Sequence, residues 1–332
     1  MRRKKSNGKM KVIVDNKIPY IKEAIEGIAD EVVYLPGHAF THEEVKDADA
    51  LIVRTRTRCN RELLEGSRVK FIATATIGFD HIDVDYCREA GIVWTNCPGC
   101  NAGSVEQYVR SVLRLLEKEK GLKLKDATLG IVGVGHVGSK VQRMAEGLGM
   151  KVLVNDPPRT DNGEEGFVDL TTIAQQCDVI TFHTPLNRGG KYNTFHLVDE
   201  SFLFGLKRKP YLINSSRGEV VDTASLLAAL AAGKVKDAII DTWEYEPNIS
   251  RELMEVAWIA TPHIAGYSAD GKANATRMSL EALCIHFGIK AEFSIVPPEG
   301  PHDYDPTRDS EWLKAAPGKF EWFRGNYPIR RE

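Results

Sequence analysis

The glycine-rich stretch at residues 128–138 constrains the fold of this chain most strongly. A short run of β-branched and apolar residues, Thr128–Val132, leads into Gly133-x-Gly135-x-x-Gly138. Residues 139–147 read as a helix, so the glycines lie at a strand-to-helix turn. Gly133 permits the tight turn, Gly135 lets the backbone approach a phosphate, and Gly138 lets the helix lie close to its strand. This pattern is typical of a site for a dinucleotide pyrophosphate.

The sequence after this turn indicates which dinucleotide is bound. The amides of His136 and Val137 would face the pyrophosphate at the start of the helix. A second strand-like run ends at Asp156, about 20 residues past the glycines, where a carboxylate can accept both adenosine ribose hydroxyls. That carboxylate would repel a 2′-phosphate, so we expect NAD rather than NADP as the cofactor. The alternative is that Asp156 only opens the turn at Asp156-Pro157-Pro158.

Composition excludes several classes of protein. The 332 residues are enough for two domains, each with its own core. With 44 basic and 46 acidic residues the chain has no net field to attract nucleic acid. No apolar run approaches the roughly 18 residues of a membrane span. Residues 1–9 are basic without the apolar segment of a signal peptide, so we expect a tail there. Scattered cysteines in a chain too large to need disulfides predict a cytoplasmic protein.

The six cysteines are scattered, apart from the pair Cys97-Pro-Gly-Cys100. A redox or zinc role for this pair is an alternative that the spacing leaves open. Zinc would need a second close pair of ligands, and no other cysteines are closely spaced. We therefore expect no metal site.

Before the glycine turn, apolar strand-like runs alternate with helix-length polar segments, which predicts a parallel sheet. The predicted strands are Lys11–Val14, Ala50–Val53, Lys70–Thr74 and Gly91–Thr95. An amphipathic helix over Ala102–Lys120 then bridges to the next domain.

From the glycine turn onward the alternation repeats, and six strands with helical crossovers predict a doubly wound sheet. They are Thr128–Val132, Lys151–Asn155, Val179–His183, Tyr211–Asn214, Ala238–Asp241 and Trp258–Ala260. A helix over residues 271–288 would return the chain to the first domain.

The predicted fold is therefore α/β, with two Rossmann-like domains, a cleft between them and a short C-terminal tail. The expected substrate domain, flavodoxin-like, comprises residues 10–101 and 267–289, and the NAD-binding domain residues 102–266. The tail, residues 290–332, is rich in proline and aromatic residues. These residues would anchor it to its own body or to a second subunit, which leaves a homodimer open.

Three segments that follow predicted strands contain the side chains suited to proton-coupled hydride transfer at a 2-hydroxy acid. They supply Arg217, Glu246 and His263. An imidazole can accept the hydroxyl proton near neutral pH, and a carboxylate would orient the ring and stabilise its charged form. The arginine fork would hold the substrate carboxylate and the C2 oxygen. Taken singly, each of these residues also has an ordinary structural interpretation.

Together with the glycine motif and Asp156, these segments resemble the D-2-hydroxyacid dehydrogenase family, over about residues 11–288. Residues 74–83, 98–102, 156–159, 181–186 and 263–268 are similar to one branch of it, which oxidises a phosphorylated 2-hydroxy acid in pyridoxal phosphate biosynthesis. The resemblance also makes Cys100 a packing residue of a family motif.

The resemblance implies a role for each matching residue. Arg217, Glu246 and His263 would be catalytic, with His263 the acid/base. The residues that would contact NAD besides the glycine turn are Asp156, Thr184, Ser215, Ser216, Asp241 and Gly266. The substrate would contact Thr55, Thr76 and Tyr267. We further expect at least one of Arg54, Arg56 and Arg58 to reach the substrate phosphate, the alternative being that all three are solvated.

Other functions remain open at this point. The substrate could be another acid of the same family, such as 3-phosphoglycerate or glyoxylate and hydroxypyruvate. A different class is an NAD-sensing, corepressor-like binding protein, which the three catalytic residues disfavour.

Overall fold

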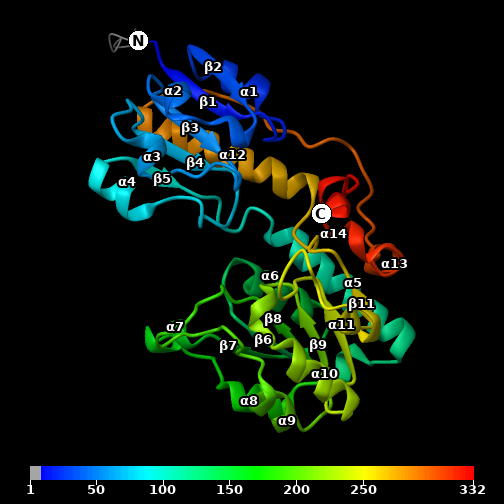
Figure 1. Cartoon of the computed structure of the whole chain (residues 1–332). Coiled ribbons are helices and arrows are strands. Elements are labelled where there is room, and N and C mark those ends of the chain that lie inside the picture. Colours follow the sequence, from blue (N-terminus) through cyan, green and yellow to red (C-terminus); the bar gives the residue numbers. More distant parts are fainter. Residues whose placement is uncertain (1–8) are drawn as a thin grey trace. The chain divides into compact units, whose positions relative to one another are not determined.

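The computed structural model describes residues 9–332, and the expected tail at residues 1–9 lies outside it except for Lys9. The chain divides into two compact units, the first formed by residues 9–101 and 268–299, the second by residues 102–267 and 300–332. Each unit contains one parallel sheet with helical crossovers (Figure 1). The predicted α/β class with two doubly wound sheets is confirmed.

The first unit contains a five-stranded parallel sheet in the order β2-β1-β3-β4-β5. This is the order of flavodoxin-like sheets. Its strands are β1 (Lys11–Asp15), β2 (Glu31–Leu35), β3 (Ala50–Val53), β4 (Phe71–Thr74) and β5 (Val93–Thr95). Its helices are α1 (Lys22–Glu26), α2 (His42–Val45), α3 (Arg61–Leu64), α4 (Val84–Ala90) and α12 (Ala269–Phe287).

Strand β2 was missed by the sequence analysis. It pairs with β1 in the register Lys11↔Glu31 and forms one edge of the sheet. No residue of β2 is fully buried, and Glu31 is exposed. Its apolar run, Val32–Leu35, is only four residues long and was not recognised as a strand.

The second unit contains a six-stranded parallel sheet in the order β11-β10-β9-β8-β6-β7. Its strands are β6 (Thr128–Val132), β7 (Lys151–Asn155), β8 (Val179–Phe182), β9 (Tyr211–Asn214), β10 (Asp237–Ile240) and β11 (Ile259–Ala260). Its first helices are α5 (Ala102–Lys120), α6 (His136–Gly147), α7 (Pro157–Asp161), α8 (Leu170–Gln176), α9 (Glu200–Gly205), α10 (Thr223–Ala231) and α11 (Arg251–Val256). The strand order reverses beside β6, and ligands of such sheets bind at the carboxyl ends of the strands near this point.

The predicted strands β3, β6, β7 and β9 and the helix α5 have the expected bounds. Two helices differ from the prediction. Helix α6 begins at His136 rather than residue 139, because its first turn includes the last glycine of the motif. Helix α12 begins at Ala269, where the Ser268 side chain accepts from the amide of Gly271 and caps it.

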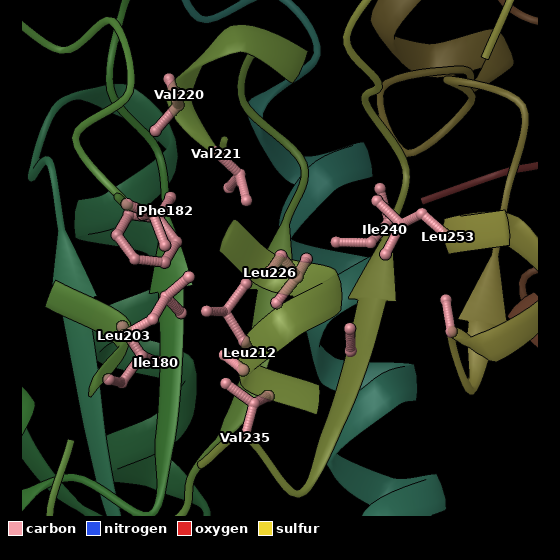
Figure 2. Packing of buried hydrophobic residues seen from close by; sticks show 14 of the residues in the cluster. Ile180, Phe182, Leu203, Leu212, Val220, Val221, Leu226, Val235, Ile240 and Leu253 are labelled. Carbon is pink, nitrogen blue, oxygen red and sulfur yellow. The ribbon is translucent and has the colours of Figure 1, made fainter. Parts of the chain in front are cut away.

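The core on one face of the second sheet fixes the strands that precede the functional loops. Ile180, Phe182, Leu212 and Leu226 are fully buried, and Figure 2 shows them packed together with Ile240. Burial of each such side chain contributes about 1.5–3 kcal/mol. Because β8, β9 and β10 all contribute to this core, their carboxyl ends are held in register.

The C-terminal segment, residues 300–332, folds onto the second unit. It forms α13 (Pro306–Ala315), the short 3-10 turn η4 (Pro317–Lys319) and α14 (Phe320–Gly325), and α13 lies next to β11 and α5 (Figure 1). Leu313 and Phe320 are buried in the core cluster that contains Phe182. Leu313 and Phe320 therefore anchor the segment to its own body, as one of the two alternatives left open by the sequence expects. Within residues 9–332, no helix has both the length and the apolar character needed to cross a membrane.

Candidate active site

The loops that follow three neighbouring strands of the second sheet bring Arg217, Glu246 and His263 together. Arg217 follows β9, Glu246 follows β10 and His263 follows β11. All three line one pocket of about 380 Å³. The predicted trio is thus assembled in one place by adjacent parallel strands.

Glu246 and His263 form a hydrogen-bonded pair. Nδ1 of His263 lies 2.8 Å from Oε2 and 3.0 Å from Oε1 of Glu246. Oε1 also accepts from the amide of Trp243 at 2.9 Å. Burial would raise the pKa of Glu246, but the hydrogen bond and charge of His263 and the Trp243 amide lower it below its usual value. An ionised carboxylate only accepts, so Nδ1 of the ring carries the proton and Nε2 is left for a substrate.

Asp241 holds the loop that carries His263. Its Oδ1 accepts from the Ile264 amide at 2.8 Å and from the Thr261 hydroxyl at 2.6 Å, and its Oδ2 accepts from the Ala265 amide at 3.0 Å. His263 has φ +54°, a strained backbone conformation for a residue with a Cβ. The hydrogen bonds of Asp241 to this loop hold it in that conformation. Burial raises the pKa of Asp241 and outweighs the hydrogen bonds and the charge of His263, which lower it. Both of its oxygens are occupied within the protein, and its contact with NAD stays a prediction.

Asn214 shapes the loop that carries Arg217. Its side-chain amide donates to the carbonyl of Arg217 at 3.0 Å, and its Oδ1 accepts from the hydroxyl of Ser216 at 2.9 Å. Arg217 uses one N–H group of its guanidinium for the carbonyl of Ser216, at 2.7 Å. Among residues 9–332 its other N–H groups have no partner, so they are available to an anionic ligand.

Gly218 and Arg188 contribute to the pocket and were not selected from the sequence. A Cβ at Gly218 would collide with the backbone of Trp243 and Glu244, so only glycine lets the two loops meet there. Arg188 lines the pocket but is paired with Glu219 at 3.0 Å and lies over the ring of Phe195. No sequence motif indicates these two contacts. Gly218 meets Trp243 and Arg188 meets Glu219, and in each case the two residues lie on loops that follow different strands.

The glycine turn has the geometry that a pyrophosphate requires. Gly133 has φ +89°, and a Cβ there would lie 2.8 Å from the backbone of His183. A Cβ at Gly138 would collide with the carbonyl of Gly133, whereas a Cβ at Gly135 would meet nothing within 4 Å. The open space at Gly135 lies at the start of α6, where the first amides point outward, so the turn fits a bound phosphate.

Asp156 lies at the end of β7, beside the glycine turn. Its Oδ2 accepts from the amide of Val134 at 2.8 Å, and its Oδ1 caps α7 by accepting from the amide of Arg159 at 3.2 Å. The capping role considered from the sequence is thus real, but it leaves lone pairs for ribose hydroxyls. Arg159 is the nearby cation that could favour a 2′-phosphate, and it is paired with Glu164. This pairing agrees with NAD as the cofactor.

Two buried hydroxyls near the carboxyl ends of β8 and β9 have no hydrogen-bond partner among the described residues. They belong to Thr184 and Ser215, both expected to contact NAD. Buried polar groups in native structures are almost always satisfied. The orphaned hydroxyls therefore fit a bound dinucleotide. Gly266 follows β11 on the loop of His263.

The predicted substrate residues fall in different units. Tyr267 lies in the second unit and packs edge-on against Tyr327, with ring centroids 5.9 Å apart. Thr55 and Thr76 lie in the first unit, after β3 and β4. The hydroxyl of Thr76 donates to the carbonyl of Gly78 at 2.9 Å.

The structure does not single out one arginine of the expected phosphate group in the first unit. Arg54 donates weakly to the carbonyl of Lys17 at 3.4 Å, and Arg56 and Arg58 are exposed.

The paired cysteines pack in the first unit. Cys97 is fully buried and its Sγ lies 3.2 Å from the carbonyl of Ala275, and Cys100 is buried and not part of a disulfide. Burial raises the pKa of Cys97, the reverse of what a reactive thiol requires.

Comparison with known proteins defines the class. Residues 102–265 match the profile described as "D-isomer specific 2-hydroxyacid dehydrogenase, NAD binding domain". NAD-bound 3-phosphoglycerate dehydrogenase from Entamoeba histolytica is 28% identical, with a TM-score of 0.68 over 85% of this chain and 96% of that one. D-lactate dehydrogenase from Aquifex aeolicus, solved with NAD and lactic acid, is 27% identical, with a TM-score of 0.63 over 84% and 96%. The fold and the NAD-binding domain are those of an NAD-dependent 2-hydroxyacid dehydrogenase.

A closer relative narrows the class. Erythronate-4-phosphate dehydrogenase from Bacteroides fragilis is 60% identical over 97% of this chain and 97% of its own length. The chain belongs to the D-isomer specific 2-hydroxyacid dehydrogenases, in the branch whose members are named erythronate-4-phosphate dehydrogenase.

Proposed function

We propose that this protein oxidises 4-phospho-D-erythronate to (R)-3-hydroxy-2-oxo-4-phosphobutanoate with NAD, in the biosynthesis of pyridoxal 5′-phosphate. The names of its relatives support this substrate. The observation that carries the chemistry is the 2.8 Å pair of His263 and Glu246 in the pocket that Arg217 also lines.

In this proposal His263 is the base. Its Nδ1–H donates to Glu246, which orients the ring and leaves Nε2 to take the proton of the C2 hydroxyl. The ring becomes positively charged as the proton arrives, and the ionised Glu246 stabilises that charge. Asp241 contributes indirectly, because it fixes the loop on which His263 lies.

Arg217 holds the substrate in place. Its free N–H groups would bind the carboxylate at C1 and the oxygen at C2, and they polarise the C2 carbonyl that forms. When bound, NAD supplies the acceptor for the hydride that leaves C2.

We further propose that residues 102–266 bind NAD and that residues 10–101 with 267–289 form the substrate domain. The NAD contacts would come from the glycine turn, Asp156, Thr184, Ser215, Ser216, Asp241 and Gly266. Tyr267, Thr55 and Thr76 are proposed as substrate contacts. The orphaned hydroxyls of Thr184 and Ser215 support the cofactor assignment.

The proposal is tested by steady-state kinetics with NAD and three acids: 4-phospho-D-erythronate, D-3-phosphoglycerate and D-glycerate. NADH formation is followed with a carbonyl trap that removes the 2-oxo product. We expect the highest kcat/KM for 4-phospho-D-erythronate. Changing His263 to alanine should lower kcat by about a hundredfold or more, since general-base catalysis contributes that much.

A preference for 3-phosphoglycerate or glycerate would overturn the substrate and leave the catalytic residues in place. Absence of turnover with every 2-hydroxy acid, with NAD still bound, would favour the corepressor-like alternative. The preformed pair of His263 and Glu246 is the observation that disfavours that alternative.

We also propose a cytoplasmic homodimer. Six free, buried cysteines are typical of a reducing compartment. The C-terminal segment exposes large apolar side chains, with Trp322 58% and Ile329 49% exposed, which a second copy could cover.

A further inference from the structure

The C-terminal segment brings a second arginine close to the Glu246–His263 pair. Arg324 lies in α14, whose first residue, Phe320, is buried in the core of the second unit. The positive charge of Arg324 helps to lower the pKa of Glu246, and Arg324 also lies beside Tyr267, four residues after His263 on the same loop. Its guanidinium lies 6.0 Å from the centroid of the Tyr267 ring and 5.8 Å from that of Phe320.

The end of the chain is fixed firmly enough to hold Arg324 there. Arg330 is almost fully buried and donates to the hydroxyl of Ser104 at 2.6 Å and to the carbonyl of Ala265 at 2.7 Å. Its guanidinium also stacks on the ring of Tyr304, 4.1 Å from the centroid. Because Ala265 lies between His263 and Tyr267, Arg330 connects the C-terminal segment directly to the catalytic loop.

The hydrogen bonds of Arg324 are incomplete. One terminal nitrogen of the guanidinium donates to Oε1 of Glu321 at 2.7 Å, and the Glu321 side chain is half exposed. The Nε–H is buried and has no acceptor among residues 9–332. A buried guanidinium with an unused donor is costly unless another acceptor completes it. The side chain is still 24% exposed, so an anion can reach the group.

The proposed substrate requires a second cation. Arg54, Arg56 and Arg58 were expected to supply it, but their contacts do not single out any of the three. Its carboxylate would take the free donors of Arg217, and a phosphate dianion then needs its own charged donors. Arg188, in the same pocket wall, is already paired with Glu219 and covered by Phe195. In the described part of the second unit, Arg330 also has buried N–H groups without an acceptor, but it is only 3% exposed. Arg324 is 24% exposed, has an unused donor, and its charge acts on Glu246 of the catalytic pair.

We propose that Arg324, with the hydroxyl of Tyr267, forms the subsite for the phosphate group of the substrate. This inference rests on the proposed function, since it assigns a phosphate to the substrate of that site. Arg324 is thus a specificity-determining residue, and the C-terminal segment is part of the active site.

The test compares Arg324→Met with wild type and with Arg308→Met, an exposed arginine of the same segment. We expect KM for 4-phospho-D-erythronate to rise about ten- to a hundredfold, the value of a charged hydrogen bond, with kcat changed much less. Competitive inhibition by inorganic phosphate should weaken by a similar factor. Inhibition by unphosphorylated D-erythronate and KM for NAD should stay unchanged, as should every parameter of Arg308→Met.

Equal loss of affinity for D-erythronate and for the phosphorylated acid would overturn the inference, because it would show a general effect on the catalytic pair. Unchanged kinetics would overturn it as well. If Arg324→Met does not fold, Arg324→Lys decides. It keeps the charge and loses the planar fork, so a rise in KM confined to the phosphorylated acid supports the subsite, and an unselective or absent rise rejects it.

The two proposals fail in different ways. If wild type does not oxidise 4-phospho-D-erythronate, the proposed function fails. The subsite is then judged by phosphate inhibition of whichever acid is oxidised, compared between wild type and Arg324→Met. If wild type oxidises the phosphorylated acid and Arg324→Met behaves like wild type, only the subsite fails.

Discussion

Glu246 shows how a single residue depends on its surroundings. Its carboxylate accepts from the amide of Trp243 on its own loop and from His263, and the second bond needs the loops after β10 and β11 to meet. The sequence identified Glu246 and His263 because both follow predicted strands, and parallel strands end at one edge of a sheet. It gave no sign of Gly218, whose need for glycine arises only where Trp243 comes close.

The lowered pKa of Glu246 makes a prediction for stability against acid. Burial acts to raise this pKa and His263 to lower it, with a net value below the ordinary 4.5. The unfolded chain therefore takes up this proton at higher pH than the folded protein does. Ionised Glu246 contributes stability that is complete above pH 4.5 and is lost as the pH falls through the lower, folded pKa.

Urea unfolding of wild type and Glu246→Gln, from neutral pH to about pH 3, measures this effect. We expect the difference in unfolding free energy between the two proteins to shrink below pH 4.5. Glu255→Gln, an exposed change in α11, should show no such pH dependence. A difference between wild type and Glu246→Gln that stays constant down to the lowest pH would contradict the account.

At the scale of elements, the long amphipathic helices and all strands but one were predictable, and the missing strand, β2, lies at a sheet edge. Strands β6, β7 and β9 and helix α5 have the expected bounds, because each strand is a run of apolar or β-branched residues and the helix has one buried face. Strand β2 was missed although Val32–Leu35 is also an apolar run, only four residues long and with no residue fully buried. The start of α6 was placed too late, since Gly138 reads as a turn residue although it packs inside the first helical turn.

Gly138 and Gly147 offer a matched pair of tests in α6. A Cβ at Gly138 would strike the carbonyl of Gly133, so Gly138→Ala should destabilise the protein by roughly 1–3 kcal/mol and weaken NAD binding. A Cβ at Gly147 meets nothing within 4 Å, so Gly147→Ala should stabilise it by about 0.4–1 kcal/mol. Chemical unfolding and NAD titration measure both effects. Equal NAD affinity in the two variants would argue against the role given to the glycine turn.

At the scale of the whole molecule, the class of fold followed from the sequence and the place of the C-terminal segment did not. Alternating strands and helices fix an α/β fold, since parallel strands need helical crossovers. The aromatic residues after residue 290 indicated anchoring, but their partners are remote in sequence. Arg330 reaches Ser104 and Ala265, contacts that no local pattern encodes. The role of Arg324 was missed for the same reason.

The most direct measurement of the central claim uses 4-phospho-D-erythronate deuterated at C2, incubated with NAD and the purified protein. If the Arg217–Glu246–His263 site removes the hydroxyl proton while the C2 hydrogen leaves as hydride, deuterium appears in the NADH that forms. The rate of this transfer should fall sharply in His263→Ala. Recovery of the deuterium in water, or equal rates for wild type and His263→Ala, would contradict the account.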